Sequence, residues 1–149
     1  AFDPALVVRM AASTLWVSPT VNAGWGKRIE HKGAPTDFFR RMSHALRQLI
    51  DGGVRLIAST DAGIPGVLHH QLPEALSVCE NFTGGPPVDI LRCATSETAM
   101  ALGLEGETGV LREGLCADIL IVDGDPAADL ADLGRPVGVV ARGGWTPIA

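Results

Sequence analysis

The spacing of apolar residues alternates between helical and strand-like along the first half of the chain. Residues 4–12 predict a helix, residues 15–18 a short strand, and residues 21–35, which contain three glycines, a loop. A second helix is predicted after Thr36, a residue type that suits an N-cap, with its apolar residues on one face. These residues follow one another at helical spacing: Phe38, Met42, Ala45, Leu46 and Leu49.

A second strand, residues 54–60, comes directly after Gly52 and Gly53, which are typical of a helix end. The resulting order of helix, strand, helix and strand favours a parallel α/β sheet. The second strand runs into Asp61. In parallel α/β folds, the residues that carry chemistry gather at the carboxyl ends of strands. Asp61 is therefore the first candidate for a functional side chain.

Helical spacing continues to about residue 105, and strand-like spacing replaces it afterwards. The predicted helices span residues 72–81, 88–94 and 99–103, with Thr95 as a candidate cap for the last of them. The predicted strands span residues 109–111, 118–122 and 137–142. We therefore expect a helix-rich α/β part over residues 1–105 and an all-β part over residues 106–149.

Composition and charge argue against several classes of protein. The 149 residues suit one domain or a piece of a larger one, and 46% hydrophobic with 19% charged residues argue against a disordered tail. The net charge is −5 and no basic patch occurs, so we expect no nucleic-acid partner. The sequence shows no apolar run of the roughly 18 residues that a membrane span needs, and no signal-peptide pattern. We expect a cytoplasmic protein with no membrane partner.

The three cysteines favour the same compartment. Cys79, Cys93 and Cys116 are odd in number, and no two have the C-x-x-C spacing of a zinc knuckle. Each has apolar neighbours in the sequence, which predicts buried thiols in a reducing cytosol rather than disulfides. A nucleophilic thiol would need a histidine or another positive charge close to it in space, which the sequence cannot show.

Three stretches together resemble the carboxyl-terminal part of a metal-dependent amidohydrolase. They are residues 16–20 (Trp-Val-Ser-Pro-Thr), residues 59–63 (Ser-Thr-Asp-Ala-Gly) and the long run from residue 94 to residue 126. That run includes Ala-Met-Ala-Leu-Gly-Leu at 99–104 and Glu-Gly-Leu-Cys-Ala-Asp-Ile-Leu-Ile-Val-Asp-Gly-Asp-Pro at 113–126. The branch it is most similar to is the imidazolonepropionase-like and Xaa-Pro-dipeptidase-like group.

The resemblance implies an α/β fold, a (β/α)8 TIM barrel with a small accessory β-sandwich beside it. Residues 1–105 would then be the last β/α units of an incomplete barrel. Residues 106–149 would be the carboxyl-terminal strands of the composite sandwich. A whole barrel takes about 250 residues. The chain of 149 residues is therefore expected to be a carboxyl-terminal portion.

The resemblance also implies chemistry at two positions. Asp61 matches the family's aspartate that binds the metal and accepts the proton of the attacking water, so it is both the catalytic and the metal-binding candidate. His69 falls where many relatives have a histidine and is the candidate for substrate binding. The expected cofactor is a divalent metal, zinc first, with one or two ions in the complete enzyme. The family's His-x-His pair and its other ligands have no match in this sequence.

The remaining polar candidates have simpler interpretations. His31 and His44 lie in a loop and a helix away from the predicted strand ends, and His69 and His70 are adjacent, which suits chelation of one ion poorly. The acidic residues of the β part match family positions in the sandwich and are expected to form turns: Asp118, Asp123 and Asp125.

Three hypotheses about function follow. In the first, the chain is a fragment of a hydrolase that acts on amide, cyclic amide or dipeptide bonds, inactive on its own, with a small-molecule amide or dipeptide as substrate. In the second, it is a truncated, non-catalytic interaction or scaffold module. Both need a partner, through self-association or a missing amino-terminal half, because a cut barrel exposes strand edges. The third, a small metal-free enzyme using Asp61 and His69, lacks a nucleophile.

Overall fold

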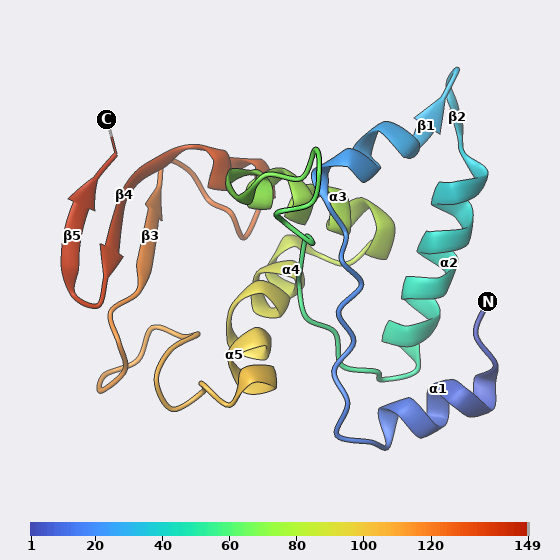
Figure 1. The fold of residues 1–149 in the computed structure, drawn as a ribbon, viewed down its shortest axis with the longest axis horizontal. Helices are drawn as coiled ribbons and strands as arrows, with labels where there is room; N and C mark the ends of the chain where they lie inside the picture. The colour runs from blue at the N-terminus through green and yellow to red at the C-terminus, as the bar shows by residue number, and fades with distance from the viewer. Residues whose placement is uncertain (149) are drawn as a thin grey trace.

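The computed structural model describes residues 1–148 and shows a mixed α/β chain that ends in a small antiparallel sheet (Figure 1). The helices are α1 (Pro4–Ala11), α2 (Asp37–Asp51), α3 (Leu72–Thr83), α4 (Pro87–Ala94) and α5 (Ser96–Leu102). Short 3-10 helices are η1 (Ala23–Arg28), η2 (His69–Gln71) and η3 (Leu130–Gly134). The strands are β1 (Glu30–His31), β2 (Ala34–Pro35), β3 (Ile119–Val122), β4 (Pro136–Ala141) and β5 (Gly144–Pro147).

The predicted helix after Thr36 is confirmed as α2, and its cap explains where it begins. The Thr36 hydroxyl accepts a hydrogen bond from the Phe39 N–H at 3.0 Å, which satisfies one of the free donors of the first turn. Leu46 and Leu49 on its apolar face are buried. The helix ends at Gly52, over which α1 packs Val7. The apolar face of α2 thus forms one side of the first hydrophobic core.

Residues 15–18 and 54–60, predicted as two parallel strands, run side by side (Figure 1), but within residues 1–148 neither forms a strand of its own. The Val17 N–H donates to the Arg55 carbonyl at 2.9 Å, and the Ile57 N–H donates to the Val17 carbonyl at 3.0 Å. The pairing amounts to a single bridge between Val17 and Leu56. Both segments therefore end at the same edge, which positions the candidate site.

Buried side chains form two neighbouring clusters. The first joins α1, α2 and α3 around Phe82, which is fully buried and contacts three other aromatic rings: Trp25, Phe38 and Phe39. The second joins Leu76 of α3 and Ile90 of α4 to Leu130 of η3. Leu130 is fully buried, so a segment beyond residue 105 packs directly onto the helices.

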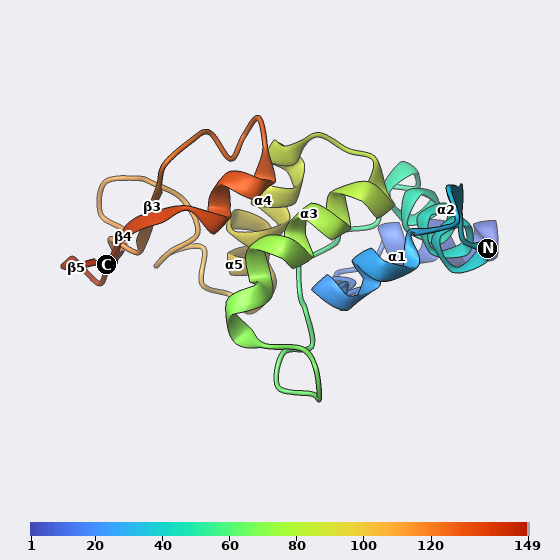
Figure 2. The same ribbon diagram turned by 90° about the horizontal axis from the view of Figure 1, so that it is seen from above.

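The sheet of β3, β4 and β5 lies at one end of an elongated molecule, with α2 at the other (Figure 2). Its strands pair antiparallel in the order β3-β4-β5. Leu120 and Ile121 are adjacent in β3 and point to opposite faces, yet both are exposed. Both faces of this sheet therefore carry uncovered apolar side chains.

Several local predictions are wrong, each for a physical reason. Residues 21–35, predicted as a loop, contain η1 and the β1–β2 hairpin. Residues 109–111 form no strand, because Gly109 has a positive φ of 99° that extended strands do not allow. Thr95 precedes α5 but does not cap it, since its hydroxyl donates to the Leu91 carbonyl instead.

Candidate active site at the strand ends

Two serines join the carboxyl ends of the parallel segments. The hydroxyls of Ser18 and Ser59 lie 2.5 Å apart and share a hydrogen bond. The Ser59 Oγ also accepts from the Thr20 N–H at 3.2 Å. Ser59 thus holds the ends of two segments that are 41 residues apart in sequence. This edge is the one at which chemistry is expected in a parallel α/β fold.

Asp61 lies two residues beyond Ser59, at this edge. Its backbone has a positive φ of 59°, a left-handed conformation that few residues other than glycine adopt. Its side chain is exposed and, among residues 1–148, makes no hydrogen bond or ion pair. An exposed carboxylate without an internal partner is free to meet a ligand, a water molecule or a cation.

His69 lies at the other end of the loop that follows Asp61. It begins η2, is exposed, and has no hydrogen-bond partner within residues 1–148. Between the two, the Gly63 N–H donates to the Val67 carbonyl at 3.0 Å and folds the loop back on itself. This loop precedes α3 in the sequence and projects from the molecule (Figure 2). Asp61 and His69 therefore lie at the two ends of one loop, and within residues 1–148 no hydrogen bond or ion pair joins them.

The described part of the chain does not by itself fit a metal ion. Residues 1–148 contain no group of three or more His, Cys, Asp or Glu side chains that could hold one. His31 and His44 are exposed on β1 and α2. Catalytic zinc takes three protein ligands and an open position, which is more than the single carboxylate of Asp61 could provide.

The acidic residues of the β part behave as turn formers. The Asp118 carboxylate accepts from the Arg142 N–H at 2.8 Å, and that of Asp125 from the Ala127 N–H at 3.0 Å. Asp123 joins its turn through its backbone carbonyl, which accepts from Arg135 Nε at 2.7 Å. Carboxylates committed to backbone N–H groups stabilise loops and are poorly placed to bind a ligand.

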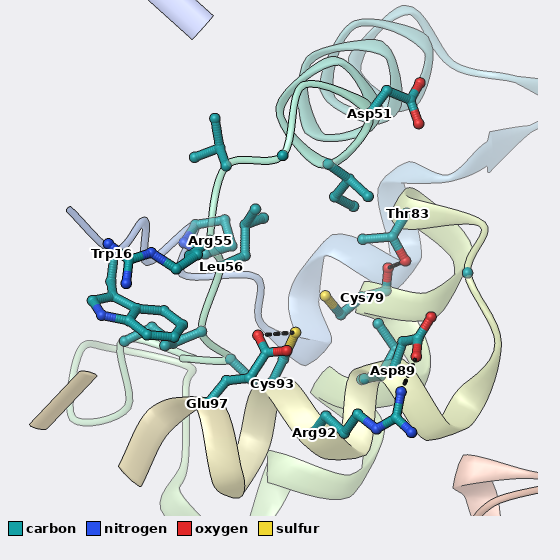
Figure 3. A pocket seen from close by; sticks show the side chains of 18 of the residues that line it. Trp16, Asp51, Arg55, Leu56, Cys79, Thr83, Asp89, Arg92, Cys93 and Glu97 are labelled. Carbon is teal, nitrogen blue, oxygen red and sulfur yellow. Dashed lines mark hydrogen bonds and ion pairs between the residues drawn. The ribbon is translucent and has the colours of Figure 1, made fainter. Parts of the chain in front are cut away.

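A cavity of about 620 Å³ lies beside the strand pair, between the segment 54–58 and the helices α3, α4 and α5 (Figure 3). Its lining is mostly apolar and, within residues 1–148, includes neither Asp61 nor His69. On its strand side, the Leu56 N–H and C=O make no hydrogen bond inside residues 1–148. The next N–H on that edge, of Ala58, donates to the Cys93 carbonyl of α4 at 3.0 Å. The cavity therefore follows a partly open strand edge.

Two thiols point into this cavity (Figure 3). Burial raises the pKa of Cys79 to about 11. Burial, and then the negative charge and hydrogen bond of Glu97, raise the pKa of Cys93 to about 12. Both remain protonated near neutral pH and are poor nucleophiles. Cys79 and Cys93 are partly buried and Cys116 is exposed, so the expectation of three buried thiols holds in part for the first two and is wrong for Cys116.

Nearly the whole chain matches one protein family. A family model described as "Amidohydrolase family" matches residues 5–146, and the chain belongs to this family. The predicted resemblance is thereby confirmed. No helix within residues 1–148 is both long enough and apolar enough to cross a membrane.

The similar proteins point to the predicted branch. The chain is 36% identical over 77 residues to an imidazolonepropionase of Rubrobacter xylanophilus, a match that covers 52% of this chain. It is 34% identical over 86 residues, 56% of the chain, to one of Chloroflexus aggregans. These matches span about a fifth of each relative, 19% and 20%.

Solved structures agree over nearly the full chain. A putative prolidase from Bifidobacterium longum superposes with a TM-score of 0.81 at 26% identity, covering 97% of this chain and 40% of that one. A Xaa-Pro dipeptidase with bound methionine gives a TM-score of 0.76 at 25% identity, covering 98% and 38%. The α/β fold class is therefore confirmed as part of an amidohydrolase, spanning about two fifths of these structures.

The serine bridge was missed by sequence reasoning. Ser18 and Ser59 each stand two positions before a residue with positive φ, Thr20 and Asp61. The positive φ values are visible only in the structure, and the two serines meet only when the segments pair, so the sequence held no signal for this bridge.

Proposed function

We propose that this chain is the carboxyl-terminal part of a hydrolase that cleaves an amide, cyclic amide or dipeptide C–N bond. In this proposal Asp61 accepts the proton of the attacking water. The observation that carries it is an exposed, unpartnered carboxylate just beyond the paired strand ends of an amidohydrolase-family chain. A positioned carboxylate that takes a proton from the nucleophile contributes about 10²- to 10⁴-fold in rate.

The other parts of the site follow from the family. A divalent metal, zinc first and one or two ions, is proposed for the complete enzyme. Its ligands other than Asp61 must come from outside residues 1–148, because no metal-holding cluster exists within them. His69 is proposed to contact a small-molecule substrate, since it is exposed on the same loop as Asp61. The chain alone is expected to be inactive.

The proposed domain division assigns residues 1–105 to the last β/α units of a barrel and residues 106–149 to strands of a composite sandwich. Two observations support a missing complement. The strand edge at Leu56 is partly open beside an apolar cavity, and β3 exposes apolar residues on both faces. We propose that an amino-terminal half of the protein, or self-association, covers these surfaces.

The test begins with the coding DNA upstream of Ala1. If the frame continues, the longer protein is expressed and assayed on imidazolonepropionate and Xaa-Pro dipeptides. Asp61→Asn should lower kcat by about 100-fold or more, whereas Asp51→Asn, the same charge change at the exposed end of α2, should leave it unchanged. An unchanged kcat in Asp61→Asn would contradict the proposal.

A second candidate function is a non-catalytic interaction or scaffold module. It is favoured by the absence of a metal-holding cluster in residues 1–148 and by the uncovered apolar sheet faces. A start codon next to Ala1 in the upstream DNA would support it. One equivalent of zinc bound to the 149-residue chain with sub-micromolar affinity, and lost in Asp61→Asn, would contradict both this function and the expected inactivity of the isolated chain.

A further inference from the structure

The two parallel segments end in the same way. In each, a serine is followed two residues later by a residue with a left-handed backbone: Ser18 by Thr20, with φ 51°, and Ser59 by Asp61, with φ 59°. A left-handed backbone is unfavourable for a residue other than glycine, and threonine is especially disfavoured because it is β-branched. Such residues persist only where the surroundings determine them.

In the first segment, hydrogen bonds of Ser59 hold Thr20 in its left-handed conformation. The Ser59 Oγ accepts from the N–H of Thr20 itself, and the Ser59 and Ser18 hydroxyls share a second hydrogen bond. Thr20 is followed by Val21, which is 2% exposed and anchors the chain in the first core. One hydroxyl thus connects the strand that bears Asp61 to a fixed point on the neighbouring strand.

Asp61 has no comparable support of its own. Within residues 1–148 its carboxylate makes no hydrogen bond or ion pair, and Thr60 between it and Ser59 makes none through its side chain. The position of the carboxylate therefore depends on the backbone. Apart from the internal hydrogen bonds of the loop itself, Ser59 is the nearest side-chain anchor on that backbone.

We propose that Ser59 is the positioning residue for Asp61, and that it acts through Ser18 and Thr20 to hold the Asp61 backbone in one left-handed conformation. The inference depends on the proposed function only for what the carboxylate does. Ser59 itself touches no reacting group. Its hydroxyl holds the ends of the two segments side by side. The Asp61 carboxylate then occupies a single position at this edge.

The test uses nuclear magnetic resonance on the 149-residue chain. The coupling between the amide and α protons, together with the Cα and Cβ shifts, reports the sign of φ at Thr20 and Asp61. Amide exchange reports the Thr20 hydrogen bond. The variants are Ser59→Ala, which removes the hydroxyl, Ser59→Thr, which keeps it, and Ser18→Ala, which leaves the Thr20 bond in place. Ser77→Ala, which removes a half-buried hydroxyl bonded to the Pro73 carbonyl in α3, is the control.

In Ser59→Ala we expect Thr20 amide exchange roughly tenfold faster and averaged Asp61 parameters in place of a single left-handed set. Ser59→Thr should restore both, Ser18→Ala should give a smaller change, and Ser77→Ala should give none at either residue. The inference is overturned if Asp61 in Ser59→Ala keeps its wild-type parameters, if Ser59→Thr behaves like Ser59→Ala, or if Ser77→Ala has the same effect.

Failure of this inference and failure of the proposed function give different results. If Asp61 does not act in hydrolysis, Asp61→Asn leaves the activity of the longer protein unchanged while the backbone response to Ser59→Ala remains. If Ser59 does not position Asp61, the backbone response is absent while Asp61→Asn still removes activity. Where both hold, Ser59→Ala lowers kcat with little change in KM, because the misplaced carboxylate acts in the reaction and not in substrate binding.

Discussion

Asp61 combines an exposed carboxylate with a backbone that resists most side chains. Because its φ is 59°, a residue without a Cβ should fit this position better than the natural one. Aspartate and asparagine tolerate the left-handed region more readily than alanine does. Stability therefore favours glycine at this position, whereas the proposed chemistry requires the carboxylate. Such a conflict is common where a side chain serves function.

Substitutions at Asp61 should separate these demands. We expect Asp61→Gly to raise the free energy of unfolding by up to about 1 kcal/mol and Asp61→Ala to lower it by about as much, with Asp61→Asn close to wild type. Urea unfolding measures all three. Lys32→Gly, at an exposed hairpin position with φ 52°, should gain stability in the same way. Equal changes in Asp61→Gly and Asp61→Ala would show that the backbone is not left-handed.

The cysteines should differ in reactivity. With pKa values raised to about 11 and about 12, Cys79 and Cys93 carry at pH 8 roughly a thousandth or less of their thiols as thiolate. We expect iodoacetamide to label exposed Cys116 first, with the sites identified by mass spectrometry. Glu97→Gln should accelerate labelling of Cys93 and leave Cys79 unchanged. Similar rates at all three would contradict the burial of the two thiols.

The same raised pKa values set a pH limit on stability. The folded state holds the thiol protons more tightly than the unfolded state, whose thiols titrate near the ordinary pKa of 9.0. Their contribution is therefore fully present below about pH 9 and is lost as the pH rises toward 11 and 12. Urea midpoints that fall over this window, and fall less in Cys93→Ala, would support the assignment.

At the scale of elements, Gly109 fixes the loop that leaves α5. Its φ is 99°, and a Cβ placed there would lie 2.6 Å from the Ala99 Cβ and 3.2 Å from the Thr95 carbonyl oxygen. Ala99 is 4% exposed, so the contact has little room to relax. The close approach of this loop to α5 is what requires glycine at this position.

We expect Gly109→Ala to lower the free energy of unfolding by about 2–4 kcal/mol, because it adds both backbone strain and a collision with α5. Gly106→Ala is the matched control, since the same loop leaves open space at that position. Thermal and urea unfolding followed by circular dichroism measure the difference. A loss in Gly109→Ala no larger than in Gly106→Ala would mean that the loop does not pack on α5 in this way.

Helices and strands that are determined by their own residues could be predicted from the sequence. Those that form only through pairing or packing with distant segments could not. The helix α2 has helical spacing and the Thr36 cap within its own residues, and it forms as predicted. Strand β5 contains two residues that disfavour strands, Gly144 and Pro147, and forms because β4 offers it an edge. The sequence predicts a strand over residues 54–60, but within residues 1–148 this segment makes a single bridge, to the segment around Val17.

The same distinction between local and distant causes decides which residues of the candidate site could be predicted. Asp61 could be proposed from its place after a strand and from the family resemblance, both of which are visible in sequence. Ser59 could not, because its partners Ser18 and Thr20 are about 40 residues away and meet it only when the strands pair. A set of metal ligands could not be predicted from this sequence either, and residues 1–148 contain no cluster of three or more such side chains.

At the scale of the whole molecule, the exposed surface is larger than that of a typical folded monomer of the same mass. A folded monomer of 15.6 kDa exposes about 7,200 Å², whereas this chain exposes 9144 Å². The excess is larger than the roughly 800 Å² that one partner contributes to an ordinary interface. Part of it is apolar, on both faces of β3 and beside the open Leu56 edge.

This excess predicts that the 149-residue chain does not remain a compact monomer. We expect light scattering coupled to size exclusion to give a concentration-dependent mass above 15.6 kDa. Leu120→Glu, which places a charge on the exposed face of β3, should shift the mass toward the monomer. Leu111→Glu, at an 80% exposed residue outside the sheet, should have little effect. A monodisperse monomer with a radius of gyration near 15 Å, as compact chains of this length have, would contradict the need for a covering partner, because a molecule that buries its own surface leaves nothing for one to cover.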